Sequence, residues 1–319
     1  MEKKTKIIII IAVCVVCALL IVGGVLYGVK EYKMRNVFAI NDNLARGNGK
    51  KAKVILLAGQ SNAAGCSFDA YLEKNVSAEQ YAAYKGGYDN VYINYFASGN
   101  NESHGFVKAA TGQGETTAHF GPELGLAEKL HEEYPDDLFF IIKYTWSGTN
   151  LFEQWLSPSS DGKTGYLYRN LIRYVKKSMD YLISKEYVPT IEGLCWMQGE
   201  SDSFSVENAT NYEIHLKNFI ADVREDLSKY ASADGIAFVD AYIAANPIYW
   251  VYCDLVNASK SAVADDSEMN VLIDTNAYGL TCANEPEENP DMAHYDSMSQ
   301  ILLGHLFGEQ VIAFFDKTE

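Results

Sequence analysis

The stretch KVILLAGQSN, residues 53–62, indicates how this chain folds. Its first seven residues form a short apolar run that ends at a glycine, which is typical of a buried strand. Five further runs of this kind follow, at 91–96, 138–146, 191–197, 236–242 and 269–275. Segments with apolar residues at helical spacing alternate with them, at 122–134, 166–186, 206–230 and 297–315. This alternation predicts a single three-layer α/β domain, in which helices cover both faces of a mainly parallel sheet.

Polar motifs follow several of these predicted strands. GQSN (59–62) follows the first strand, WSGTN (146–150) the third and QGESD (198–202) the fourth, while DMAH (291–294) precedes the last helix. Ligand sites of open α/β sheets lie at the carboxyl ends of the strands. We therefore expect these four loops to converge on one cleft.

Ser61, His294 and Asp291 have the side chains that a serine nucleophile requires. A serine hydroxyl is a poor nucleophile unless a base takes its proton. His294 is the candidate base, and Asp291, three residues earlier, is placed to fix its tautomer and to stabilise the imidazolium. Asp296 is a rival partner for the histidine. The structural alternatives are a helix-capping serine and an exposed loop histidine beside the acidic stretch EPEEN.

A site for acyl transfer also needs hydrogen-bond donors aimed at the developing oxyanion. The candidates are the backbone N–H groups of Ser61 and Gly148 and the side-chain amide of Gln198. Gly148 could equally be an ordinary turn glycine, and Gln198 could cap a strand. Trp146 and Trp155 flank the loop after the third strand, where their faces could hold sugar rings or could pack the core.

The charge of the chain is distributed unevenly. Residues 1–36 hold six basic and two acidic residues, so they carry +4, and the rest carries −20 of the total of −16. A body this acidic repels phosphate backbones, which argues against nucleic-acid binding. It also favours neutral substrates over polyanions.

Residues 7–29 contain no charged residue and begin IIIIIAVCVVCALLIV. Twenty-three residues of helix span roughly 35 Å, enough for a hydrocarbon core of about 30 Å. We expect a short basic tail at 1–6, a membrane anchor at 7–29, a stalk at 30–51 and the functional domain at 52–319, outside the cytoplasm. A cleaved signal peptide is the competing interpretation. The orientation stays open because basic residues flank both ends of the segment.

The four motifs together resemble the sialate O-acetylesterase-like group of SGNH hydrolases, which includes carbohydrate esterase family 6. The similar segments are GQSN (59–62), KYTWSGTNLFEQW (143–155), WMQGESD (196–202), DMAHYD (291–296) and HFGPELGLAEKL (119–130). The resemblance covers roughly residues 52–315. It implies a flavodoxin-like sheet and an acetylesterase that acts on sugars. It also implies Ser61 as nucleophile, His294 as base, Asp291 as its partner, and Gly148 with Gln198 in the oxyanion hole.

We therefore expect a membrane-anchored carbohydrate O-acetylesterase that forms an acetyl-enzyme and needs neither cofactor nor metal. Gln60, Asn62, Glu200 and Trp155 are expected at the substrate, although Glu200 and Asp202 could instead hold their loop, and the choice between Gln198 and Glu200 at the oxyanion stays open. An O-acyltransferase and a non-catalytic glycan-binding protein are the alternatives. Cys66, Cys195, Cys253 and Cys282 lack the spacing of a zinc or redox site, and pairing of Cys253 with Cys282 stays open.

Overall fold

The computed structural model describes residues 38–315 of the 319-residue chain. The expected membrane anchor at 7–29 lies outside the described residues, and so does the first part of the expected stalk. Within 38–315, no helix combines the length and the apolar character that crossing a bilayer requires.

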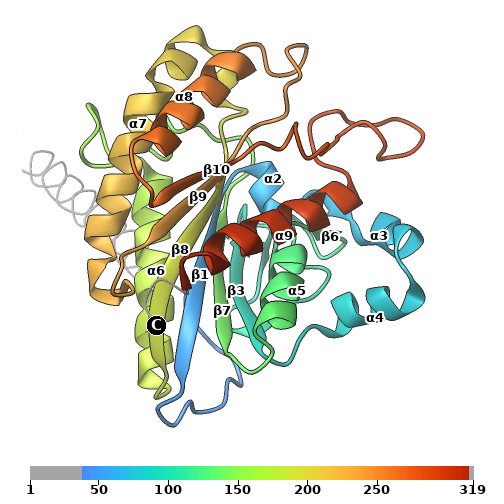
Figure 1. The fold of residues 1–319 in the computed structure, drawn as a ribbon, viewed down its shortest axis with the longest axis vertical. Helices are drawn as coiled ribbons and strands as arrows, with labels where there is room; N and C mark the ends of the chain where they lie inside the picture. The colour runs from blue at the N-terminus through green and yellow to red at the C-terminus, as the bar shows by residue number, and fades with distance from the viewer. Residues whose placement is uncertain (1–37, 316–319) are drawn as a thin grey trace, which may run out of the picture. The chain divides into compact units, whose positions relative to one another are not determined.

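A mainly parallel sheet organises the described chain (Figure 1). Its central strand is β1 (Lys51–Gly59), with β7 (Phe139–Thr145) and then β3 (Val91–Ala97) on one side. On the other side lie β8 (Val188–Met197), β9 (Ala237–Ala241) and β10 (Asn270–Ile273). These six strands are parallel, whereas the short β4 (Asn101–Glu102) and β5 (Val107–Lys108) pair antiparallel with β3. The predicted α/β fold with a mainly parallel sheet is confirmed.

The strand order contains the flavodoxin-like order that the family resemblance implies, with one strand added at the edge. A flavodoxin-like sheet places its first strand between the second and the third. Here the order is β10-β9-β8-β1-β7-β3, so the third parallel strand, β7, lies between β1 and β3. Without the edge strand β3, the strands β1, β7, β8, β9 and β10 follow the flavodoxin-like order 2-1-3-4-5, and β3 is an additional strand beyond β7.

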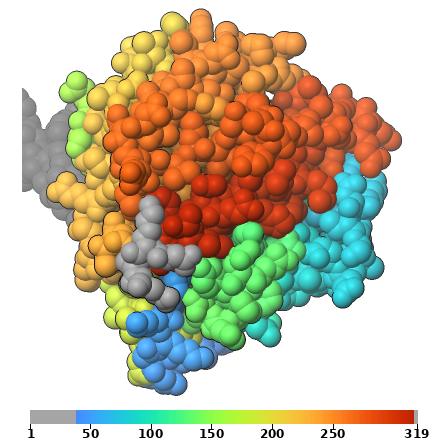
Figure 2. Space-filling model, in the orientation of Figure 1, coloured from blue at the N-terminus to red at the C-terminus, as the bar shows by residue number. Residues whose placement is uncertain are grey.

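Helices cover both faces of the sheet. One face carries α5 (Glu123–Glu133) and α9 (Ser297–Ile312), which lie against each other although they are far apart in the sequence (Figure 2). The opposite face carries α6 (Tyr166–Ser184) and α7 (Val206–Asp226), and α8 (Cys253–Asp265) packs against α7 and β10. Each of the four predicted helices is present, with bounds that differ by a few residues.

Besides β4 and β5, four helices, two 3₁₀ turns and a two-stranded sheet were not predicted. They are α2 (Ser61–Ala64), α3 (Asp69–Asn75), α4 (Ala78–Gly86), α8, the 3₁₀ turns η1 (Asp202–Phe204) and η2 (Ser228–Tyr230), and the two-stranded sheet of β2 (Ser67–Phe68) and β6 (His119–Phe120). The buried stripe of α8 contains Ser259 and Lys260. These polar residues hide the helical period on which the prediction depended.

Part of the expected stalk belongs to the folded domain. The larger compact unit begins at Ile40, and the 40–50 segment is hydrogen-bonded to it. Asn41 N donates to His104 O at 2.6 Å, and Gly47 N donates to Lys185 O at 2.7 Å. Residues 40–50 therefore belong to the body, and the expected boundary at residue 52 moves toward residue 40.

A buried ion pair lies beneath the end of the central strand. Lys143 in β7 and Glu123 at the start of α5 are both fully buried, with 2.7 Å between Nζ and Oε2. Lys143 also donates to Ala64 O at 2.8 Å and to Gln113 O at 2.9 Å. The lysine therefore joins the sheet, α5 and the end of α2.

Replacing Lys143 should destabilise the protein strongly. In Lys143→Met the carboxylate of Glu123 stays buried without its cation, which costs about 3–5 kcal/mol in comparable pairs. Urea denaturation of the variant should show this loss in the free energy of unfolding. Lys217→Met removes two partly exposed ion pairs, with Glu213 and with Asp266, and should change the stability far less. Equal effects of the two substitutions would contradict the structural role of Lys143.

Candidate active site

Three of the four motif loops leave the sheet at the same level. Gly59 at the end of β1 is paired with Thr145 of β7 and with Met197 of β8. Trp146 N donates to Gly59 O at 3.0 Å, and Gln60 N donates to Met197 O at 2.9 Å. A side chain at Gly59 is excluded, because its Cβ would lie 1.9 Å from Met197 O and the φ of 140° disfavours other residues. The three loops therefore start side by side.

Ser61 is the first residue of α2, directly after β1. Its side chain is largely buried, with 7% of the residue exposed. Among the described residues, none accepts a hydrogen bond from Ser61 N–H. The serine thus lies at the carboxyl end of the central strand with its backbone donor available.

His294 is held by Asp291, as the sequence predicted. Asp291 Oδ2 lies 2.7 Å from His294 Nδ1, and Asp291 Oδ1 accepts from the N–H groups of Ala293 and His294, both at 2.8 Å. Burial opposes ionisation of Asp291, but these three contacts outweigh it and lower its pKa. The rival Asp296 instead accepts from Asn284 and Glu285.

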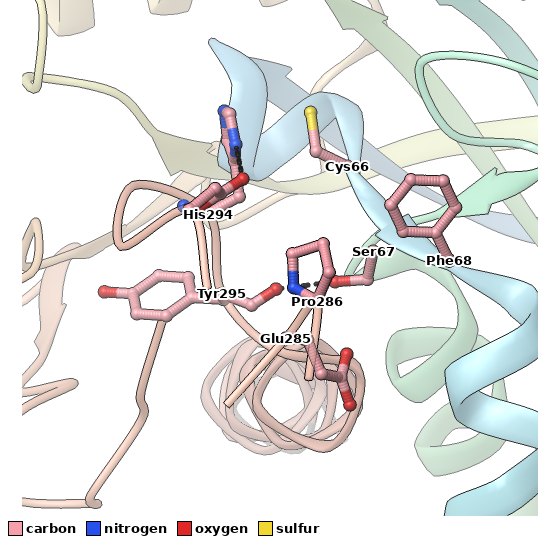
Figure 3. A pocket seen from close by; sticks show the side chains of 8 residues that line it. Cys66, Ser67, Phe68, Glu285, Pro286, His294 and Tyr295 are labelled. Carbon is pink, nitrogen blue, oxygen red and sulfur yellow. Dashed lines mark hydrogen bonds and ion pairs between the residues drawn. The ribbon is translucent and has the colours of Figure 1, made fainter. Parts of the chain in front are cut away.

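The thiol of Cys66 is the second polar group beside His294. Burial opposes the charged form of His294, but its contact with Asp291 and the nearby Cys66 sulfur together raise the pKa of His294 from 6.5 to about 10. Cys66 Sγ also lies 3.7 Å from Ser61 O. Figure 3 shows Cys66 and His294 on the same side of a pocket, which Phe68, Glu285 and Pro286 also line. Cys66 thus contacts both the nucleophile turn and the candidate base.

Gly148 lies in the turn after β7 and is exposed. Its φ of 67° is left-handed, which suits glycine, and no described residue accepts a hydrogen bond from its N–H. The neighbouring Ser147 is fixed by hydrogen bonds with Ser98 and Glu115. The second predicted backbone donor is therefore available in an ordered turn.

Gln198 does not have the predicted role of an oxyanion donor. It is completely buried, and its Nε2 donates to Thr149 O at 2.9 Å and to Asp202 Oδ2 at 2.6 Å. Both amide protons are thereby used, and Tyr212 O–H donates to Oε1 at 3.0 Å. Gln198 instead joins the loop after β7 to the loop after β8.

The four residues expected at the substrate are all buried. Gln60, Asn62, Glu200 and Trp155 are exposed by 2%, 1%, 1% and 0% respectively. Trp155 donates from Nε1 to Thr149 Oγ1 at 2.8 Å and packs edge-on against Trp196, so its ring faces the interior. Gln60 accepts from Ser201 N at 3.2 Å. These side chains support the loops and offer no face to a ligand.

Asp202 holds its loop, which is the role expected for it. Its carboxylate accepts from Leu151 N at 2.9 Å and from Phe152 N at 3.2 Å, besides the amide of Gln198. Burial outweighs these contacts and raises the pKa of Asp202 to about 6.

Two residues near the site were not identified from the sequence. Cys66 carries no motif signal, since its spacing from the other cysteines indicates neither a zinc site nor a redox site. Lys143 had a signal, because it is the one charged residue in the apolar run 138–146. The four cysteines within 38–315 are free thiols, and three of them are buried. The described part of the chain holds no cluster of three His, Cys, Asp or Glu side chains suited to a metal ion.

One family of known proteins matches most of the chain. Residues 51–313 match the family model described as carbohydrate esterase, sialic acid-specific acetylesterase. A search among curated proteins found no significant match.

Solved structures share the fold at low sequence identity. The crystal structure of NanS is 15% identical with a TM-score of 0.63, over 86% of this chain and 100% of that one. A protein from Arabidopsis thaliana is 17% identical with a TM-score of 0.60, over 82% and 98%. A carbohydrate acetylesterase from Xanthomonas citri is 16% identical with a TM-score of 0.55, over 82% of this chain and 56% of that one.

The pKa of His294 predicts how the site responds to pH. A histidine must be neutral to act as a base, so a pKa above 6.5 means that reaction with p-nitrophenyl acetate should rise as the pH increases past 6.5. Cys66→Ala removes one group that raises this pKa, and it should move the rising limb to lower pH. The profile of kcat/KM against pH measures both effects.

Cys253→Ala is the matched control, since this thiol is buried away from His294. It should leave the rising limb in place. A limb at or below pH 6.5, or a Cys66→Ala profile identical to that of the parent, would contradict the assigned electrostatics.

Proposed function

The chain belongs to the sialic acid-specific acetylesterase family of carbohydrate esterases, and on this basis we propose that it removes acetyl groups from sugars with Ser61 as the nucleophile. The observation that carries the proposal is the contact between the turn of Ser61 and the loop of His294. Asn62 hydrogen-bonds the residues on both sides of His294, whose ring Asp291 holds at 2.7 Å. These contacts support one shared site for the proposed nucleophile, base and orienting carboxylate.

In the first half of the reaction, Ser61 Oγ attacks the carbonyl carbon of the acetyl ester. His294 takes the hydroxyl proton, and Asp291 stabilises the imidazolium that forms. The N–H groups of Ser61 and Gly148 donate to the developing oxyanion; one such donor is worth about 10²–10³ in rate. The C–O bond to the sugar then breaks, the sugar oxygen takes the proton from His294, and the acetyl group stays on Ser61.

In the second half, water attacks the acetyl group and His294 takes its proton. The tetrahedral intermediate collapses with release of acetate, and the proton returns to Ser61 Oγ. The mechanism involves side chains and backbone donors alone and assigns no step to a metal or a cofactor.

Acidic side chains lie close to this site. Glu285 and Asp291 line the pocket beside His294, and Glu115 hydrogen-bonds Ser147 next to Gly148. Like charges near a site lower the local concentration of an anionic ligand. We propose that neutral acetylated sugars are better substrates than sialylated ones.

Substitution of Ser61 should separate an enzyme from a binding protein. Ser61→Ala should abolish acetate release from acetylated glycans because no acetyl-enzyme can form, while far-UV circular dichroism should show an unchanged fold. The panel should contain neutral and sialylated acetyl glycans, and the parent enzyme should favour the neutral ones. Acetate release by Ser61→Ala at the parent rate would refute the assignment, and transfer of acetyl to an acceptor glycan would indicate an acyltransferase.

We also propose that residues 7–29 anchor the enzyme in a membrane and place the domain outside the cytoplasm. The support is the uncharged run of 23 residues in the sequence. The full chain should stay in the membrane pellet after extraction with alkaline carbonate, and a chain lacking 7–29 should appear in the supernatant. Release of the full chain by carbonate would contradict an integral anchor.

A further inference from the structure

We infer that Asn62 and Glu200 are positioning residues, which hold the loop of His294 against the turn of Ser61 and do not contact the substrate. The inference rests on the proposed function, because it concerns how the proposed nucleophile and base are kept together. It differs from the sequence-based expectation, which placed both residues at the substrate.

The loop of His294 needs such support. Residues 274–296 contain neither helix nor strand, so backbone pairing does not fix the position of His294. Asp291 fixes the ring within this loop, but it belongs to the same loop and cannot place the loop relative to Ser61. Contacts with another element must set that distance.

Asn62 supplies those contacts from the residue directly after Ser61. Its Oδ1 accepts from Tyr295 N at 3.0 Å, and its Nδ2 donates to Ala293 O at 3.3 Å. The two partners flank His294 in the sequence. One side chain therefore holds the base loop on both sides of the base, and any shift of that loop must break these bonds.

Glu200 fixes the orientation of the Asn62 amide. Its Oε1 accepts from Asn62 Nδ2 at 2.7 Å, which is the shortest of the three hydrogen bonds of this side chain. A carboxylate oxygen only accepts, so the N–H₂ end of the amide faces Glu200 and the oxygen end faces Tyr295 N. The loop after β8 thereby determines how Asn62 holds the base loop.

Burial separates both residues from the substrate. Asn62 and Glu200 are each only 1% exposed, whereas Cys66 and His294 are partly exposed beside the pocket. Ser67 Oγ adds a 2.6 Å hydrogen bond to Tyr295 O from the same side. The contacts of Asn62 thus lie in a buried layer beneath the reacting groups.

The first test measures Asn62→Ala with p-nitrophenyl acetate. Loss of the two loop contacts should lower kcat by about 10²-fold, the order expected for a displacement of about 1 Å, with KM changed by less than about threefold. Asn94→Ala is the matched control. Asn94 is equally buried and is bonded to Ser178, Ser103 and Tyr174, so the variant should lose stability but keep kcat.

The second test compares two variants of Glu200, one that removes only its charge and one that also removes its hydrogen-bond acceptor. Glu200→Gln keeps an acceptor for Asn62 and should retain kcat within about threefold, whereas Glu200→Ala should resemble Asn62→Ala. The double variant Asn62→Ala/Glu200→Ala should be no slower than the worse single one, because the two residues act as a unit. A base or substrate contact at Glu200 would instead make Glu200→Gln as slow as Glu200→Ala.

The third test exchanges the amide of residue 62 and the carboxylate of residue 200. It keeps the inference testable if an alanine variant disrupts the loop. Asn62→Asp places two carboxylates together and should be slow, and adding Glu200→Gln restores a hydrogen bond of opposite polarity. The swapped double variant still lacks a donor to Ala293 O, so its kcat should lie between that of Asn62→Asp and that of the parent. A swapped variant no faster than Asn62→Asp, or an Asn62→Ala enzyme with full kcat, would overturn the inference. An active Ser61→Ala would instead overturn the proposed function.

Discussion

The site depends on the parallel pairing of β1 with β7 on one side and β8 on the other. This pairing brings three loops to the same edge of the sheet, and the chain changes direction across the sheet at β1. The approach is close enough that Gly59 admits no side chain beside Met197 O. Ser61 lies two residues after Gly59, so the position of the central strand determines the position of the proposed nucleophile.

The second constraint is that the polar groups beneath the site are buried and most of their atoms are hydrogen-bonded, although Glu200 Oε2 has no partner among the described residues. Gln198 and Asp202 join the loop after β8 to the loop after β7, and Asn62 with Glu200 joins them to the base loop. A buried polar group without a partner costs free energy, so these bonds favour one arrangement of the loops. Lys143 adds a further buried contact by donating to Ala64 O at the end of α2. The reacting groups thus rest on a connected polar layer.

The sheet, the main helices and the contact between Asp291 and His294 could be predicted from the sequence, because apolar periodicity and a three-residue spacing are local signals. Strand order is not a local property, so the place of β3 beyond β7 could not be predicted from its sequence. The roles of Gln198 and Trp155 were misassigned for a related reason. The sequence motif of Gln198 is the same whether its amide contacts a ligand or Thr149 O. Only the packing of the neighbouring loops determines which of these the amide contacts. Cys66 gave no signal because its partner is 228 residues away.

The central claim is that Ser61 is the activated group of a single site built by these loops. The most direct measurement is peptide mapping of the full chain after reaction with a fluorophosphonate, followed against the loss of acetylesterase activity. The account predicts one adduct, on Ser61, formed in proportion to the activity lost. An adduct on another residue, or full activity after complete modification of Ser61, would contradict it.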